Sequence, residues 1–113
     1  MKIIHKNQTR KFKNSESCLA FEYPLGSKKM SGAVVNLSGR YPNEGKMVNL
    51  ECAELVYIIS GSGYISVNNK RNKISKGDMI LIKPKERVFW EGKMSTLAVS
   101  CPAWNSKQHK IIE

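Results

Sequence analysis

The sequence predicts an all-β fold, and two features of the chain carry this prediction. Short apolar runs alternate with Gly, Pro and Asn along most of the 113 residues, as expected where strands are joined by turns. Sustained apolar spacing at every three and four residues, which marks an amphipathic helix, is missing. A chain of this length suits one domain that buries its own core. We therefore expect a single all-β domain over residues 1–113.

The first half of the chain is expected to contribute an arm and three strands. Residues 1–16 form an N-terminal arm or edge strand, and the core of the domain spans about 17–101. Pro24 and Gly26 close the first core strand, and Gly and Pro make residues 39–45 a loop. The strands expected in this half are Ser17–Tyr23, Ser31–Leu37 and Met47–Glu51.

Turn residues divide the second half. Gly61-Ser62-Gly63 is expected to turn the chain, and Asn68-Asn69 to close a hairpin, because Asn tolerates a positive φ. Lys76-Gly77-Asp78 and Glu91-Gly92-Lys93 mark two further turns. The C-terminal tail, residues 102–113, is too polar for an element to be assigned. The strands expected here are Glu54–Ser60, Tyr64–Asn68, Arg71–Ser75, Met79–Lys83, Val88–Glu91 and Thr96–Cys101.

Two of the expected strands are apolar on both faces. In Leu55–Ile59 and Met79–Ile82, odd and even positions are equally apolar, which is typical of a strand covered on both sides. No long helix is available, so the second cover must be another sheet or a second subunit. A jelly-roll sandwich whose outer face pairs with a symmetry-related copy meets both needs, and we expect a homodimer. The alternative is that the barrel's own N-terminal strands cover one of the two.

The chain is strongly basic, with 19 Lys and Arg residues against 9 Asp and Glu residues and a formal net charge of +10. Such a field attracts nucleic acid or anionic ligands. The basic residues are scattered, however, and no helix-turn-helix, zinc-finger or aromatic RNA-binding pattern accompanies them. We interpret them as a solvated basic surface, so nucleic acid is not expected as a partner.

Cysteine usage and hydropathy indicate a cytoplasmic protein. Cys18, Cys52 and Cys101 are far apart and odd in number, which favours free buried thiols over a disulfide framework or a zinc site. No apolar stretch is long enough to span a bilayer, and the first residues lack the apolar region of a secretory signal. We expect a soluble cytoplasmic protein with no membrane partner.

Two spaced motifs resemble those of the cupin superfamily. Glu54 followed after six residues by Gly61 is similar to the second half of the first cupin motif. Gly77-Asp78, an apolar strand and then Lys83-Pro84 resemble the second motif. The resemblance covers about residues 39–101. It implies a small single-domain cupin, a jelly-roll barrel also described as a double-stranded β-helix.

The resemblance does not extend to the metal ligands of the family. Metal-binding cupins carry a His-x-His pair shortly before the Glu of the first motif, and a further His after the prolines of the second. These positions hold Val48, Leu50 and Val88 here, whose alkyl side chains have no lone pair for a metal ion. Only Glu54 keeps a donor. The resemblance therefore implies the fold without the metal-dependent chemistry, and no metal or cofactor is expected.

A displacement of one residue in this strand leaves an alternative open, because it turns every side chain to the opposite face. Asn49 and Glu51 would then point inward with Glu54, and Cys52 would lie beside them. In that register Glu51, Cys52 and Glu54 form a candidate metal site.

In the undisplaced register, the barrel interior is a candidate ligand site. We expect an apolar pocket for a small organic molecule, with Glu54 as its carboxylate and Arg40, Tyr41 or Arg87 as the partner of Glu54. The alternative is a packed barrel with Glu54 at the rim. His5 and His109 are the only histidines and are expected at the surface. The candidate ligand-binding residues are Val48, Leu50, Glu54, Val88, Trp90, Arg40 and Tyr41.

Three functions are compatible with these residues. The first is a metal-free cupin that binds a small organic ligand in the barrel without catalysis. The second is a metal-independent sugar isomerase or epimerase, in which Glu54 is the base and Tyr41, Tyr57 or Tyr64 donates a proton. The third is a regulatory interaction protein whose basic surface meets an acidic partner.

Overall fold

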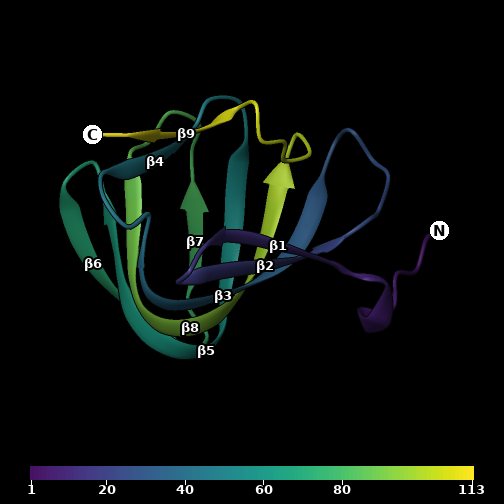
Figure 1. The fold of residues 1–113 in the computed structure, drawn as a ribbon, viewed down its shortest axis with the longest axis horizontal. Helices are drawn as coiled ribbons and strands as arrows, with labels where there is room; N and C mark the ends of the chain where they lie inside the picture. The colour runs from purple at the N-terminus through teal and green to yellow at the C-terminus, as the bar shows by residue number, and fades with distance from the viewer.

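The fold is one nine-stranded antiparallel sheet that curls around its own concave face (Figure 1). The computed structural model describes residues 1–113. The predicted all-β jelly-roll class is confirmed, since the only helical segment is the 3-10 turn η1, Lys6–Gln8. None of its helical segments has the length and apolar character needed to cross a membrane. The strands are β1 (Arg10–Ser15), β2 (Cys18–Tyr23), β3 (Ser31–Tyr41), β4 (Lys46–Asn49), β5 (Ala53–Val67), β6 (Lys70–Ser75), β7 (Met79–Ile82), β8 (Val88–Cys101) and β9 (His109–Ile112).

Three long strands, β3, β5 and β8, form the frame of the sheet. β8 lies between the other two and pairs with β3 along one side and with β5 along the other. β1 and β2 extend the sheet beyond β3, while β6 and β7 extend it beyond β5. The short strands β4 and β9 pair with each other and join the sheet through β8.

The three long strands bend at a row of glycines. Gly92 of β8 pairs with Gly39 of β3 on one side and with Gly63 of β5 on the other. Gly39 and Gly92 have φ of +125° and +128°, a region that residues with a side chain rarely adopt. A Cβ on Gly63 would lie 2.0 Å from the carbonyl oxygen of Glu91, so the strands approach too closely there for a side chain. The row allows the sheet to fold over on itself.

These bends correct three predicted boundaries. The turns expected at residues 61–63 and 91–93 lie inside the continuous strands β5 and β8, because glycine bends a strand here without ending it. The loop expected at residues 39–45 begins later, since β3 continues to Tyr41. The hairpin turn at Asn68-Asn69 is confirmed, with φ of 49° and 69°.

Both ends of the chain contribute strands. The N-terminal arm contains β1, which pairs with β2. The tail contains β9, which pairs with β4 so that His109 lies opposite Asn49. Polar residues dominate the tail and outweigh its one strand signal, the Ile111-Ile112 pair. The backbone of β4 supplies the hydrogen-bonding edge that β9 needs.

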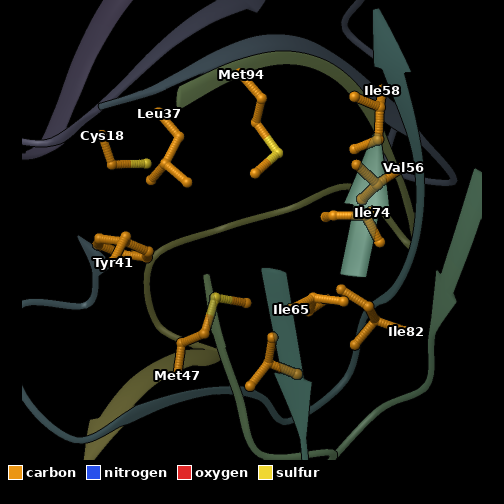
Figure 2. Packing of buried hydrophobic residues seen from close by; sticks show 11 residues of the cluster. Cys18, Leu37, Tyr41, Met47, Val56, Ile58, Ile65, Ile74, Ile82 and Met94 are labelled. Atoms are coloured by element: carbon orange, nitrogen blue, oxygen red, sulfur yellow. The ribbon is translucent and has the colours of Figure 1, made fainter. Parts of the chain in front are cut away.

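The hydrophobic core occupies the concave side of the sheet (Figure 2). Ile58 of β5 and Val88 of β8 are completely buried, with 0% exposure, and Val56 of β5 has 2%. Alternate side chains of a strand share a face, so Val56 and Ile58 point together into the core.

The convex side of the sheet is apolar but open to solvent. Leu55 and Tyr57 of β5 are 40% and 39% exposed, and their cross-strand neighbours on β7 and β8 are apolar as well. This arrangement explains why the sequence is apolar on both faces of these strands. One face packs in the core, and the other is uncovered in the single chain.

Candidate functional site

A cavity of about 320 Å³ lies next to the core and is bounded by β1, β2, β3, part of β8 and the C-terminal tail. Cys18, Tyr41 and Met47 of the core cluster line it. Figure 2 shows these three on the side of the cluster that is opposite Val56 and Ile58. The interior is therefore packed around β5 and hollow toward β2 and the end of β3.

Aromatic side chains form part of the cavity wall. Both tryptophans of the chain, Trp90 and Trp104, line the cavity together with Phe12. The rings of Phe12 and Trp104 meet edge to face with centroids 6.0 Å apart, and the ring of Trp104 lies 5.4 Å from that of His109. Such walls suit the flat faces of a small organic molecule.

Five polar residues form a hydrogen-bonded group at the cavity, here called the polar cluster: Tyr41, Asn49, Glu54, Gln108 and His109. Asn49 Nδ2 donates to Oε1 of Glu54, and Gln108 Nε2 donates to Asn49 Oδ1 at 3.0 Å. His109 Nδ1 lies 2.9 Å from Asn49 Oδ1, and His109 Nε2 lies 2.9 Å from the Tyr41 hydroxyl oxygen. Tyr41, Glu54 and His109 line the cavity directly.

Strand ends bring the polar cluster together. Asn49 is the last residue of β4, Tyr41 the last of β3, and His109 the first of β9. Because His109 pairs with Asn49 in the β4–β9 register, their side chains start from adjacent backbone positions. Glu54 is the second residue of β5, reached after a short turn from Asn49.

Gln108 holds that turn in place. Its backbone oxygen accepts from the N–H of Leu50 at 2.9 Å. Its side-chain Oε1 accepts from the N–H groups of Glu51 and Cys52, both at 3.1 Å. The side chain is 3% exposed, so these backbone groups depend on Gln108 for their hydrogen bonds.

Burial shifts the protonation of the titratable members of the polar cluster. The pKa of Glu54 is raised by burial, and the hydrogen bond from Asn49 opposes this shift. Burial raises the pKa of Tyr41 to about 12, with smaller contributions from Cys18 and Glu54. Burial lowers the pKa of His109. At neutral pH Tyr41 is therefore protonated and His109 is neutral. Glu54 releases its proton at a higher pH than an exposed glutamate does.

The cavity lining includes three of the seven predicted ligand-binding residues: Tyr41, Glu54 and Trp90. Val88 lies instead in the packed core, where it has 0% exposure, and Val48 is buried outside the lining. Leu50 lies in the turn after β4 and is 43% exposed. The expectation that Leu50 points into the barrel is wrong, because the chain leaves the strand at Asn49 and turns outward.

Arg40 also lies outside the lining, since its guanidinium is held elsewhere. It donates to the carbonyl oxygens of Pro42 and Gly45 at 2.5 and 3.0 Å and lies 4.1 Å above the Phe89 ring. The prediction that Arg40 pairs with Glu54 is therefore wrong. An amide, Asn49, is the partner instead.

The register displaced by one residue predicts the direction of Asn49 correctly, but the metal site that it implied is not present. Asn49 faces Glu54, as that register predicted. Glu51 is exposed, and the thiol of Cys52 donates to the carbonyl oxygen of Pro102 at 3.2 Å. No three His, Cys, Asp or Glu side chains lie close enough together to hold a metal ion. Glu51, Cys52 and Glu54 therefore do not form a site.

The polar cluster also does not fit the metal ion of metal-binding cupins. Such an ion needs three or four protein donors. Glu54 offers one carboxylate, while both ring nitrogens of His109 are engaged by Asn49 and Tyr41. Asn49 Oδ1 already accepts two hydrogen bonds.

His109 and Gln108 are functional residues that sequence reasoning missed. The expectation that His109 lies at the surface is wrong, since it lines the cavity. The available signal was the Ile111-Ile112 pair, because two β-branched residues in a polar tail are typical of a short strand. A strand at these residues can pair with the sheet, and such pairing places His109 beside the barrel.

Comparisons with known proteins agree with this architecture. The profile of the AraC-like ligand-binding domain family matches residues 39–91, just under half of the chain. Pac13, described as a nucleoside dehydratase and solved as the Streptomyces protein, aligns with a TM-score of 0.89 and 17% identity, covering 100% of this chain and 92% of that one. No curated protein matches the sequence.

Two further solved structures share the fold. Ectoine synthase from P. lautus has a TM-score of 0.76 and 16% identity, covering 100% of this chain and 91% of that one. KdgF from Halomonas sp. has a TM-score of 0.75 and 9% identity, covering 95% of this chain and 97% of that one. At these identities the likeness concerns the fold. Together with the curled sheet, it shows that the chain has the fold of a small cupin domain, and its sequence has Val48, Leu50 and Val88 at the positions where metal-binding cupins carry histidines.

Proposed function

We propose that the protein binds a small hydroxylated organic molecule in the cavity, at the polar cluster, without a metal ion. One observation carries this proposal. Every fully buried side-chain nitrogen and oxygen has a hydrogen-bond partner, whereas Oε2 of Glu54 has none in the protein. That oxygen is therefore accessible from the cavity. An apolar pocket with a few converging polar groups is the usual form of a small-molecule site.

The size and walls of the cavity suit a molecule such as a sugar or a nucleoside. Its volume of about 320 Å³ lies at the lower end of the range for organic ligand pockets. Trp90 and Trp104 line the cavity and provide aromatic surface for a planar group. The fold neighbour Pac13 was solved in three variants with uridine, which makes nucleosides the first compounds to examine.

The two tryptophans make binding measurable without a label, because both line the cavity. Titration with nucleosides and free sugars should produce a saturable change in tryptophan fluorescence. Tyr41→Phe should weaken the binding about tenfold or more, since it removes the hydroxyl at the polar cluster. Tyr64→Phe is the matched control, because Tyr64 packs under Arg71 outside the cavity. Equal affinity in the two variants would overturn the assignment of the site.

Acid–base catalysis on the bound molecule is a second candidate, favoured by the position of Glu54. Burial raises the pKa of its carboxyl, which is how a carboxyl becomes able to take up and return a proton near neutral pH. In this step Oε2 of Glu54 takes a proton from a carbon of the ligand and later returns it. Pac13, described as a dehydratase, and ectoine synthase share the fold, which supports a search for enzymatic activity.

Hydrogen exchange tests this step directly. When candidate ligands are incubated in heavy water, the wild type should exchange one carbon-bound hydrogen, as followed by NMR. At saturating ligand, Glu54→Gln should lose the exchange, because an amide takes no proton from carbon. Exchange that persists in Glu54→Gln contradicts the role of Glu54 as the base.

We also propose that a second copy of the chain covers the convex side of the sheet. Two cross-strand rows make up this outer apolar face: Leu81–Leu55–Val99 and Met79–Tyr57–Leu97. None of the six is charged, although the chain carries a net charge of +10. Two such chains repel one another over most of their surfaces. An uncharged apolar face is the part through which they can associate.

A further inference from the structure

We propose that the backbone N–H groups of Glu51 and Cys52 fix the direction of every hydrogen bond in the polar cluster, so that its cavity side offers only acceptors. The cavity then selects a neutral ligand that donates hydrogen bonds through hydroxyl groups, and rejects phosphorylated or carboxylate ligands. The ligand class rests on the proposed function, whereas the hydrogen-bond directions rest on the geometry alone.

The orientation of the Gln108 amide sets the direction of the first hydrogen bond in the polar cluster. Two N–H donors, from Glu51 and Cys52, point at Oε1 of Gln108 at 3.1 Å each. A backbone N–H only donates, so this atom must be the amide oxygen and not the nitrogen. The amide nitrogen of Gln108 therefore faces Asn49 and donates to it at 3.0 Å.

Asn49 is oriented in turn. The atom that accepts from Gln108 must be Oδ1 of Asn49, so Nδ2 points to the other side and donates to Glu54. Asn49 and Gln108 are each 3% exposed. Rotating either amide by 180° would therefore place like groups against one another without water to replace the lost bonds.

The hydrogen bond with Asn49 determines which ring nitrogen of His109 carries the hydrogen. Because Oδ1 of Asn49 only accepts, Nδ1 of His109 at 2.9 Å must carry the hydrogen. Burial lowers the pKa of His109, so the ring is neutral and Nε2 holds a lone pair. Nε2 lies 2.9 Å from the Tyr41 hydroxyl, which must donate its only hydrogen to it.

Where the polar cluster meets the cavity, it presents hydrogen-bond acceptors to a ligand. The Tyr41 oxygen has used its hydrogen and keeps its lone pairs. Burial raises the pKa of Glu54, and at a pH above that raised pKa Oε2 of its carboxylate adds a second acceptor. Among the residues that line the cavity, Arg10 is the only permanent cation, against the carboxylates of Glu22 and Glu54. An anionic ligand at the polar cluster would meet lone pairs and a negative charge, in spite of the basic outer surface.

NMR tests the directions in the ligand-free protein. A long-range ¹H–¹⁵N spectrum should show His109 as the Nδ1–H tautomer, and the Nε2–H tautomer would overturn the proposal. Gln108→Glu should change His109 to the Nε2–H tautomer. The carboxylate of the variant faces Asn49 with an acceptor, so the Asn49 amide rotates to donate to it. His109 Nδ1 then lies opposite the Asn49 nitrogen, which is a donor. Asn105→Asp adds the same charge on the exposed surface of the tail and should leave the tautomer unchanged. An Nδ1–H tautomer retained in folded Gln108→Glu would also contradict the proposal.

Matched ligands test the selectivity. Uridine and uridine 5′-phosphate, and ribose and ribose 5-phosphate, should be titrated against the tryptophan fluorescence of the wild type. The neutral member should bind about tenfold or more tightly in at least one pair, since the phosphate brings an uncompensated charge to the acceptors. Tighter binding of the phosphorylated members overturns this inference and leaves the small-molecule site standing. Failure of all four compounds to bind overturns the ligand class together with the proposed function, while the histidine tautomer still decides the hydrogen-bond directions.

Discussion

Asn49 donates a hydrogen bond from Nδ2 to Oε1 of Glu54 at the point where β4 ends and β5 approaches. This bond lowers the pKa of Glu54, while burial raises it and is the larger of the two effects. Asn49 therefore supports the charged form of a carboxylate beside an apolar cavity. It also links Glu54 to His109 and through it to Tyr41.

Replacing Asn49 with Ala should destabilise the protein by about 1–3 kcal/mol, because the buried groups of Gln108, Glu54 and His109 lose their shared partner. Urea unfolding at neutral pH measures the change. Asn36→Ala, at an exposed position of β3, is the matched control and should change stability by less than about 0.5 kcal/mol. Equal effects of the two substitutions would show that the Asn49 bonds contribute nothing.

Glu54→Gln should stabilise the protein at pH 8, on the order of 1 kcal/mol, because an amide has no charge to desolvate. The pKa of Glu54 is raised in the folded state, so the wild type loses stability as pH rises through that raised pKa. Below the ordinary pKa of a glutamate the carboxyl is neutral in both states. The advantage of Glu54→Gln should therefore disappear as pH falls to about 4.

Thermal unfolding of both proteins between pH 4 and pH 8 checks this dependence. Glu16→Gln is an informative control, because the hydrogen bond from Lys13 and the charge of Lys13 lower the pKa of Glu16. Its stability difference should be small and of opposite sign at neutral pH, since the pair is exposed to solvent. A Glu54→Gln difference that stays constant over this range contradicts the burial of the Glu54 charge.

Ile58→Ala should destabilise the protein by about 2–5 kcal/mol, because it opens a cavity in the packed part of the core. Ile58 has 0% exposure. Leu50→Ala removes a similar volume from a side chain that is 43% exposed and should cost less than about 1 kcal/mol. Denaturant unfolding of the pair also tests the outward position of Leu50, since a large loss in Leu50→Ala would place it inside the barrel.

Tyr57→Lys should convert the protein from a dimer to a monomer, because it puts a charge at the centre of the outer apolar face. Light scattering coupled to gel filtration should give about twice 12.8 kDa for the wild type and one chain for the variant. Ser75→Lys adds the same charge at an exposed position of β6 and should remain a dimer. A wild type that is monomeric at high concentration rules out this association.

Much of the fold was predictable because it depends on local patterns. The turn at Asn68-Asn69 follows from the tolerance of Asn for a positive φ, and Val56 and Ile58 alternate inward as strand residues do. The bends at Gly63 and Gly92 were predicted as turns, because glycine signals a break in both cases. What distinguishes them is the close approach of neighbouring strands, a long-range property that local sequence does not contain.

The candidate site was predictable only in part, for a related reason. Tyr41, Glu54 and Trp90 lie on strands whose direction follows from alternation and from the cupin resemblance. His109 and Gln108 come from a tail whose position depends on pairing with β4. The exclusion of Leu50 depends on where the chain leaves β4, which is a difference of one residue. Such a difference reverses the direction of each side chain.

A crystal structure of the protein with its tightest-binding neutral compound tests the central claim most directly. The protein should be purified without chelators, so that any bound metal ion is retained. We expect ligand hydroxyls within hydrogen-bond distance of the Tyr41 oxygen and Oε2 of Glu54, with the ligand in contact with Trp90 or Trp104. A metal ion coordinated by Glu54, or a ligand bound outside this cavity, would contradict the account.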